Sequence, residues 1–293
     1  MRNSSRPDPS ICRGTTFATL GLVSLGWLAE VHAGVVMNSQ HNNPGAPDAK
    51  PGITTYSFQD GAMRVEVHGS DGSTRDVMLF RDQAMYQLDP GNKTFMRFDK
   101  TQMAAMGDKL AQARQQMAAQ MQSMTPEQRA MMQQAMDRMG GGAMSAPAQA
   151  PVYTVRELGK ADTVAGIRCA MWEVSENGQK RSEVCAATPA SLPGGSEILQ
   201  TMQQLSEMSR NMMNSLRQGM GSSRQDHGVP GFWSQLQKIG GVPILSRTFD
   251  SSGKLDSEVR VLDIKNQSLT PAQFDVPADY KDRTPKLLQA GGH

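Results

Sequence analysis

Short apolar runs separated by turn residues fill much of the N-terminal half and constrain the fold more than any other feature. The runs 53–59 and 62–68 flank Asp60-Gly61, a dipeptide typical of a two-residue hairpin turn. Within the second run apolar and polar residues alternate, so one face of the strand would be buried and the other solvated. Such strands joined by tight turns predict an antiparallel meander. Further strands are predicted at 35–39, 74–81, 84–89 and 94–99.

A methionine-rich segment at 101–139 interrupts this strand pattern. It holds nine methionines, spaced mostly by three, four or seven residues, so a helix would gather them into one broad stripe. Thr125, Pro126 and Gln128 have the spacing of an N-cap, a first helical position and a capping box, which divides the segment in two. Two helices and a Gly-, Ala- and Pro-rich linker are therefore predicted at 101–123, 126–139 and 140–151.

A second series of strands follows the linker. Strands are predicted at 152–158, 167–175, 179–187, 244–250 and 255–264. A helix with a second methionine stripe is predicted at 196–220, a short helix at 232–238 and a closing segment at 269–280. The chain thus has about eleven strands and two helical insertions. Because both insertions follow strand meanders, the helices can pack on one face of a single curved sheet.

Residues 1–33 have the organisation of a secretory signal peptide. Arginines precede an apolar run at 17–29, and Val31-His32-Ala33 forms a small-residue cleavage site. A membrane anchor is the alternative, but the run is short for a membrane span. We therefore expect a cleaved signal peptide, no stable membrane anchor and a periplasmic location. The predicted domain then extends over 34–281, with helical insertions at 101–139 and 196–220 and a disordered tail at 282–293.

The charge balance argues against a nucleic-acid partner. The whole chain has a formal net charge of +2, and cleavage would remove three Arg, one Asp and one Glu, which leaves +1. Proteins that bind nucleic acids usually carry a strong basic excess to neutralise phosphates. A near-neutral chain offers no such surface.

Two cysteines, Cys169 and Cys185, remain after cleavage. An even pair in an exported protein favours a disulfide over free thiols. A three-residue loop at 176–178 would place Cys169 directly opposite Cys185, and Glu173 opposite Arg181. A disulfide here would stabilise the fold by about 3 kcal/mol in the chain-entropy model.

Several segments resemble a known family. They are, in chain order, MYQLD at 85–89 with NKTF at 92–95, TPEQR at 125–129, PIL at 243–245 and FDVPADY at 274–280. In this order they are similar to segments of exported proteins of unknown function related to the LolA-like lipoprotein-carrier superfamily. The resemblance implies an α+β, mainly β fold: an antiparallel curved sheet, or unclosed β-barrel, with helices over its concave face. In carrier relatives that face receives acyl chains.

No motif of the sequence indicates an enzyme. After cleavage the histidines are His41, His68, His227 and His293, and no two of them have metal-ligand spacing. Nucleophile-elbow, phosphate-loop and HExxH patterns are absent from the sequence. We therefore expect a non-enzymatic protein that needs no cofactor and has no metal site.

The methionine stripes permit three interpretations. Flexible thioether side chains can fill irregular space against the sheet, or line a cavity that opens for an apolar ligand or a partner helix. Sulfur atoms spaced like those of Met117, Met121 and Met124 can also bind Cu(I). The candidate ligand-binding residues are Met117, Met121, Met124, Met132, Met136, Met202, Met208 and Met212.

These observations together predict an exported binding protein. It would hold a lipid, an acyl group or a protein partner under its methionine-rich helices. Cu(I) binding in the cell envelope and a purely structural envelope role are the alternatives.

Overall fold

The computed structural model of the chain contains two strand meanders that join into one sheet. The residues described are 32–45, 50–128, 131, 152–220 and 238–285. Residues 1–31 of the predicted signal peptide, the linker at 140–151 and most of the predicted helix at 232–238 lie outside them. All described residues belong to one compact unit that begins at residue 31.

The first meander contains six strands. They are β1 (His32–Asn42), β2 (Gly52–Gln59), β3 (Ala62–His68), β4 (Thr74–Arg81), β5 (Ala84–Asp89) and β6 (Thr94–Asp99). The bounds of β3 to β6 are those predicted. At the β2–β3 turn Asp60 and Gly61 have φ angles of 51° and 76°, and positive φ at both central residues matches the twist of the paired strands. β1 is longer than predicted, and cleavage after Ala33 would remove its first two residues.

The second meander contains five strands and is interrupted by a helix. The strands are β7 (Tyr153–Val164), β8 (Ile167–Glu176), β9 (Gln179–Ala187), β10 (Val242–Phe249) and β11 (Leu255–Leu269). The helix α3 (Gly195–Met220) lies between β9 and β10 in the chain, and α1 (Lys100–Ser123) lies between the two meanders. These helices match the predicted segments 101–123 and 196–220 within one residue at each end.

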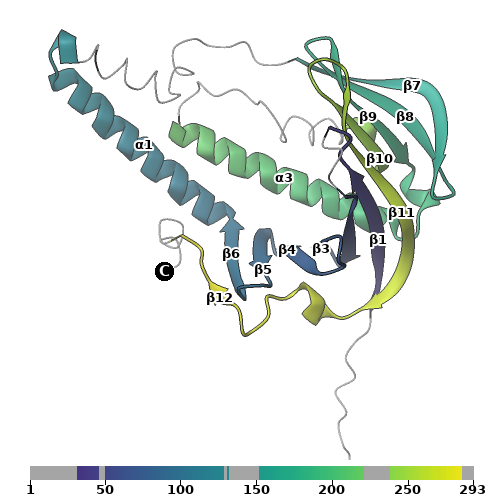
Figure 1. The fold of residues 1–293 in the computed structure, drawn as a ribbon. Helices are drawn as coiled ribbons and strands as arrows, with labels where there is room; N and C mark the ends of the chain where they lie inside the picture. Colours follow the sequence, from purple (N-terminus) through teal and green to yellow (C-terminus); the bar gives the residue numbers. More distant parts are fainter. Residues whose placement is uncertain (1–31, 46–49, 129–130, 132–151, 221–237, 286–293) are drawn as a thin grey trace, which may run out of the picture. The chain divides into compact units, whose positions relative to one another are not determined.

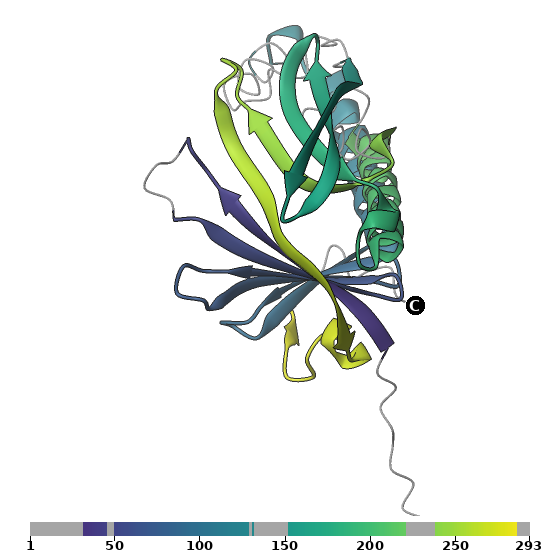
Figure 2. The same ribbon diagram turned by 90° about the vertical axis from the view of Figure 1, so that its right-hand side faces the viewer.

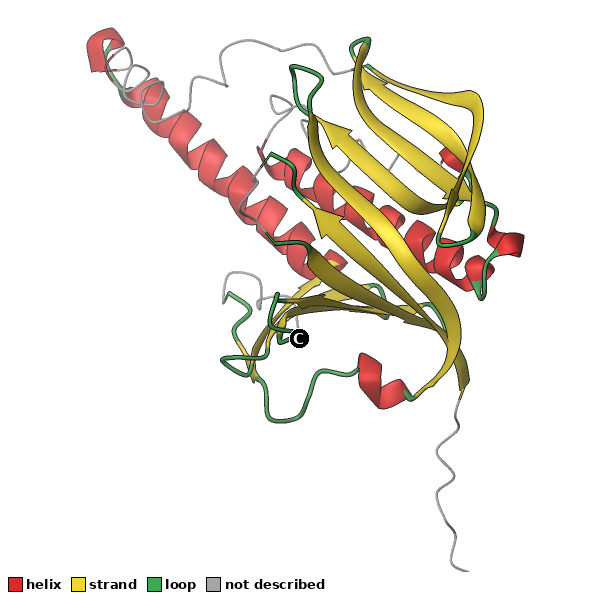
Figure 3. Ribbon diagram, turned by 45° about the vertical axis from the view of Figure 1, so that its right-hand side comes forward, coloured by secondary structure: helices red, strands yellow, loops and turns green. Residues whose placement is uncertain are grey.

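One ladder joins the two meanders. β1 pairs with β2 on one side and with β11 on the other, for example Met37 with Tyr56 and with Ile264. The order across the sheet is β12-β6-β5-β4-β3-β2-β1-β11-β10-β9-β8-β7. Among the described strands β7 and β12 lie at opposite edges and do not pair with each other, so the sheet is curved but unclosed (Figures 2 and 3). The predicted mainly β, unclosed architecture is confirmed, with twelve strands instead of about eleven.

The chain continues in regular structure beyond the predicted domain end. A short strand, β12 (Lys281–Asp282), pairs in parallel with β6. The backbone N–H of Arg283 donates to the Phe95 carbonyl at 2.8 Å, and the Thr284 hydroxyl accepts a hydrogen bond from Arg97 N at 2.8 Å. Thr284 is buried. The structure therefore differs from the predicted tail at 282–293 in its first residues; residues 286–293 lie outside the described part.

The helix α3 lies inside the curve of the sheet (Figure 1). Ile198 and Met208 are buried in the main apolar cluster, together with residues of β1, β2, β4, β9 and β10. Fully burying one such side chain contributes about 1.5–3 kcal/mol. Gly194, just before the helix, has a φ of 57°, and a Cβ there would collide with Val35 of β1. This glycine lets the start of α3 approach the sheet closely.

The helix α1 begins with a capping box. Asp99 Oδ1 accepts a hydrogen bond from Gln102 N at 2.8 Å, and Gln102 Oε1 accepts one from Asp99 N at 3.3 Å. Met103 is buried, but the described side chains from 112 to 120 are exposed. α1 packs beside α3 and extends away from the sheet (Figure 1).

The predicted helix start at 126 is also capped as expected. Thr125 Oγ1 accepts a hydrogen bond from Gln128 N at 3.3 Å, and Gln128 Oε1 accepts one from Thr125 N at 3.1 Å. Residues 126–128 are helical, whereas 132–139 lie outside the described residues.

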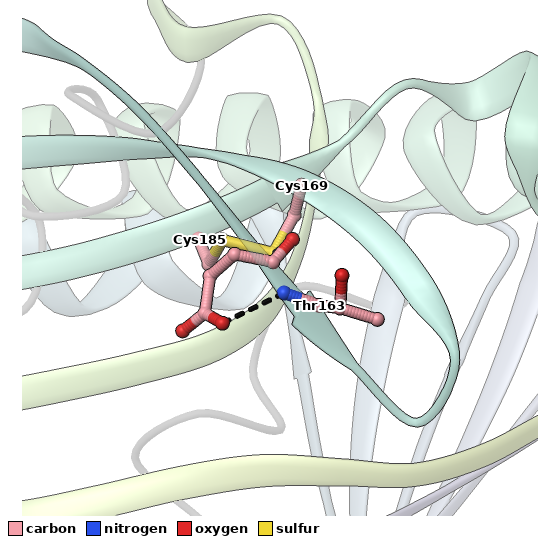
Figure 4. Close-up of a disulfide and its surroundings, with 4 residues drawn as sticks. Thr163, Cys169 and Cys185 are labelled. Atoms are coloured by element: carbon pink, nitrogen blue, oxygen red, sulfur yellow. Dashed lines mark hydrogen bonds between the residues drawn. A yellow bond between two sulfur atoms is a disulfide. The ribbon is translucent and has the colours of Figure 1, made fainter.

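The β8–β9 hairpin contains the predicted disulfide but not the predicted register. Cys169 and Cys185 are bonded, with Cα atoms 5.3 Å apart (Figure 4). The turn has two residues, not three, and the register shifts between Val174 and Ser175. Cys185 therefore pairs with Met171, and the disulfide joins the strands diagonally.

The predicted Glu173–Arg181 pair is wrong for the same reason. Glu173 faces Glu183 across the ladder and forms its ion pair with Arg156 of β7 at 3.3 Å. Arg181 instead pairs with Glu176 at 2.9 Å. Asn177 and Gly178 have φ angles of 52° and 80°, the two-residue turn geometry that an Asn-Gly dipeptide favours. The extra residue is accommodated inside the strand as an irregularity.

Candidate ligand-binding site

The structure separates the candidate methionines into two environments. Met208 of α3 is buried, and Met202 and Met212 are partly buried against the same apolar cluster. Met117 of α1 is 42% exposed and belongs to no described cluster. Met124 follows α1 and is half-buried. Met121 lies in α1, but its side chain, like Met132 and Met136, lies outside the described part.

Methionines from the sheet meet those of α3. Met37 and Met63 are buried in the same cluster as Met208, and Met85 and Met171 pack at its edge. Such unbranched side chains adapt to irregular space between a helix and a twisted sheet. Under α3 the methionine stripe is thus a filled interface.

A cavity of about 700 Å³ opens at one end of this interface. Its wall combines the β2–β3 turn, the β4–β5 turn, the first residue of α1, the middle of α3 and the segment around the short helix η3 (Pro271–Phe274). Pockets of about 300–1,000 Å³ are typical of small-molecule sites. The residues that line it are Gln59, Asp60, Gly61, Ala62, Phe80, Arg81, Asp82, Gln83, Lys100, Gln204, Glu207, Met208, Asn211, Pro271, Phe274 and Asp275.

Three large apolar side chains from separate elements contribute to the wall. Phe80 of β4 is 1% exposed, Met208 of α3 is 6% exposed, and Phe274 of η3 is 4% exposed. All three are almost wholly buried, so they belong to the core and border the cavity at the same time.

Hydrogen bonds hold the parts of the wall together. Gly61 N donates to Glu197 Oε1 at 2.7 Å, which fastens the β2–β3 turn to α3. Arg64 Nη1 donates to the Gln273 carbonyl at 3.0 Å and so attaches η3 to β3. The cavity therefore has a wall with defined geometry on both the helix side and the sheet side.

The charged groups of the wall are mostly acidic. Four carboxylates and two cations line the cavity: Asp60, Asp82, Glu207, Asp275, Arg81 and Lys100. Arg81 is engaged by two of the acids, Asp82 at 3.0 Å and Asp275. Glu207 has a single described ion pair, a long one of 4.0 Å with Arg210, and Asp60 has none among the described residues. The side of the cavity near Asp60 and Glu207 is thus electronegative.

One buried amide at the wall has no hydrogen-bond partner. Gln59, the last residue of β2, is 4% exposed, and neither its Nε2 nor its Oε1 has a partner among the described residues. Such an unsatisfied buried group costs about 1–3 kcal/mol. Thr201 and Ser206 of α3 also have buried hydroxyls without described partners, but they do not line the cavity.

Burial also affects a tyrosine of the core. Desolvation raises the pKa of Tyr56, which packs against the main apolar cluster, above its ordinary value. The phenol is therefore neutral at physiological pH.

The described part of the chain has neither a metal-binding cluster nor a membrane-spanning helix. In that part of the chain no three His, Cys, Asp or Glu side chains come close enough to hold a metal ion. None of its helices combines the length and apolar character that a membrane span requires.

Residues 100–280 match the model of a protein family described as Domain of unknown function (DUF4412). The matched residues are more than half of the chain. The protein belongs to the DUF4412 family. No curated protein matches the chain.

Solved structures with a similar arrangement of strands share little sequence with this DUF4412 protein. An uncharacterized conserved protein from Thermus thermophilus is 8% identical with a TM-score of 0.42, and the match covers 86% of this chain and 90% of that one. MucB of the Pseudomonas aeruginosa MucA/MucB complex is 14% identical with a TM-score of 0.36, over 86% of this chain and 58% of that one.

A LolA superfamily protein from Nitrosomonas europaea is also among the similar structures. It is 9% identical with a TM-score of 0.25, and the match covers 83% of this chain and 89% of that one. With TM-scores of 0.42 and below, these similarities indicate neither an activity nor a ligand.

The DUF4412 match and the cavity overlap only in part. Lys100, the α3 residues and the η3 residues of the wall lie within 100–280, whereas the β2–β3 and β4–β5 turns precede it. The site therefore depends on the N-terminal meander as well as on the matched residues.

The sequence alone predicted one residue of this cavity, Met208. The others come from segments far apart in the chain, which only the fold brings together. One local signal in the sequence indicated this wall. Gln204, Glu207 and Asn211 are three and four residues apart, so on a helix they form a polar stripe beside Met208.

Proposed function

We propose that this DUF4412 protein is an exported, non-enzymatic binding protein that holds the apolar group of a ligand in the cavity beside α3. One observation carries the proposal: a cavity of about 700 Å³ whose wall contains Phe80, Met208 and Phe274. Binding sites combine such apolar walls with a few polar groups that orient the ligand, and the polar lining here supplies them.

The methionines of α3 have a specific part in this proposal. Met208 contacts the ligand, and Met202 and Met212 pack in the same cluster behind it. Changes in the rotamer of Met208 would adapt the wall to ligands of different shape, because its side chain has three rotatable bonds.

The periplasm is the proposed location. The charged, apolar and small-residue regions of 1–33 favour export, and the disulfide between Cys169 and Cys185 is the kind of bond that persists in oxidising compartments.

Native mass spectrometry of delipidated protein, combined with lipid extraction from undelipidated protein, tests ligand binding. We expect one neutral amphiphile, such as an alkyl maltoside below its micelle concentration, to bind per chain. The Gln204→Trp variant should weaken this binding at least tenfold, because Gln204 is an exposed side chain of the cavity wall and an indole would occupy the space.

Gln203→Trp is the matched control. Gln203 is the neighbouring exposed residue of α3 and does not line the cavity, so its replacement should leave binding unchanged. A delipidated protein that takes up no amphiphile, or a Gln203→Trp variant as impaired as Gln204→Trp, would refute the assignment.

A further inference from the structure

The polar half of the cavity wall defines the chemistry of the ligand more closely than the apolar half does. Gln59 is buried with both amide atoms unpaired, and Asp60 follows it directly in the chain. A primary amide has donors and an acceptor on one plane, and a peptide group offers an acceptor and a donor in return. A ligand with a peptide group can therefore satisfy both sides of Gln59.

The Gln59 amide can reach such a ligand by a side-chain rotation. Its polar atoms are closed off from water, although the residue lines the cavity. Rotation would exchange an unsatisfied buried amide for a hydrogen-bonded one, which favours the bound state.

The charges of the wall select a positive ligand. Arg81 is engaged by Asp82 and Asp275, so the acids not matched by a close ion pair are Asp60 and Glu207. Lys100 is a cation of the same wall, but four carboxylates against two cations leave the wall with a net charge of −2. A carboxylate or phosphate group placed beside them would be repelled, whereas an ammonium or guanidinium group would be attracted. Both acids line the same cavity as Phe80, Met208 and Phe274.

We propose that the cavity binds a peptide segment in which an apolar residue lies next to a lysine or arginine. The apolar side chain lies against Phe80, Met208 and Phe274, its peptide group pairs with Gln59, and the basic side chain lies near Asp60 and Glu207. This inference rests on the proposed function and names the ligand class of the same cavity.

Isothermal titration calorimetry with the full mature protein tests the ligand class. The probes are a short, terminally capped peptide of alternating leucine and lysine, and its twin with glutamate in place of lysine. We expect the lysine peptide to bind at least about tenfold more tightly than the glutamate twin, and the difference to narrow at high salt. Equal affinities for the two peptides would overturn the proposal.

Two changes on the protein test the residues named. Asp60→Asn combined with Glu207→Gln should remove the preference for lysine, while Asp76→Asn, an exposed acid outside the cavity, should preserve it. Gln59→Leu should lower the affinity for the lysine peptide about tenfold. Unchanged peptide affinity in folded Gln59→Leu would remove Gln59 from the site.

A change on the ligand keeps the test valid if a variant does not fold. The same lysine peptide with N-methylated backbone amides lacks the N–H donors that pair with Gln59 Oε1, and it should bind the unmodified protein about tenfold more weakly. Equal binding of the methylated peptide would contradict pairing with Gln59. Binding of the maltoside but of neither peptide would overturn this inference alone, and binding of none would overturn the proposed function as well.

Discussion

The two methionine-rich helices have similar methionine contents and opposite roles in the fold. Along α3, Ile198 and Met208 are buried and Leu205 is partly buried, so one face of the helix is part of the core. Along α1, Met103 is the one large side chain of the described residues that is buried, and Met117 is exposed. Methionine content therefore does not tell whether a helix is held by the core. The spacing of its apolar residues relative to polar ones, and the surface it meets, decide that.

The largest expected difference between the helices is in their contribution to stability. Ile198→Ala should lower the free energy of unfolding by about 3–4 kcal/mol, because a fully buried side chain leaves a cavity that the sheet and helix cannot close. Met117→Ala, the matched change on α1, should alter it by less than about 0.5 kcal/mol. Urea unfolding followed by circular dichroism measures both. Similar losses in the two variants would show that α1 is as much a part of the core as α3.

The disulfide should have the next largest effect, since Cys169 and Cys185 belong to the cluster on which α3 packs. Replacing both by alanine should lower the free energy of unfolding by about 3 kcal/mol, the value for closing a loop of this length. Reduced unmodified protein should unfold at the same urea concentration as the double variant. Two alkylatable thiols in the native, unreduced protein would contradict the bond itself.

A smaller effect should distinguish how the helices begin. Asp99→Ala removes the N-cap of α1 and should destabilise its first turn by about 1 kcal/mol. Because α1 makes few core contacts, we expect faster amide exchange at the start of α1 and unchanged exchange in α3, as measured by hydrogen exchange with mass spectrometry. Asp108→Ala removes an exposed charge from the interior of α1 and serves as control. Exchange that rises equally in both helices would mean that they unfold together.

The smallest expected effect is on the pH dependence of stability, and it involves Glu258 of β11. Partial burial raises the pKa of Glu258, but hydrogen bonds from Arg247 and Arg260 lower it more, so the net value lies below the ordinary 4.5. The carboxylate therefore stabilises the fold above the ordinary Glu pKa, and this contribution is lost as the pH falls through the lowered pKa of the folded state.

A Glu258→Gln variant should have a flatter dependence of the melting temperature on pH in the acid range. The same substitution at Glu127, an exposed residue after α1, should leave the dependence unchanged. If the unmodified protein loses no stability on acidification through this range, the ion pairs of Glu258 with Arg247 and Arg260 do not contribute to folding.

The local signals of the sequence predicted much of the first meander. The bounds of β3 to β6 follow from alternation of apolar and polar residues and from turn dipeptides such as Asp60-Gly61, all of which act within a few residues. The capping residue Thr125 likewise marked a helix start locally. The cysteine pair was found because an even pair in an exported chain favours a disulfide.

The register of β8 and β9 was not predictable in the same way. The irregularity between Val174 and Ser175 leaves one residue of β9 unpaired. It changes the partner of every β8 residue farther from the turn, including Glu173. The Asn177-Gly178 dipeptide favours a two-residue turn, but nothing in the local sequence predicts the shift that follows it inside the strand. The packing of both faces of β9, where Val184 and Cys185 are each fully buried in different clusters, selects the register.

By itself, then, the sequence determined eleven of the twelve strands, the helices α1 and α3, the disulfide and the mainly β class, because each depends on neighbours along the chain. Tertiary structure alone decided that β1 joins β11, that β12 pairs with β6, and that α3 is core while much of α1 is not. It also decided the cavity, whose wall joins Gln59, Phe80, Met208 and Phe274 from four elements. Contacts between residues so distant in the chain depend on how the sheet curves and on where α3 crosses it. No local sequence pattern predicts the curvature or the crossing point.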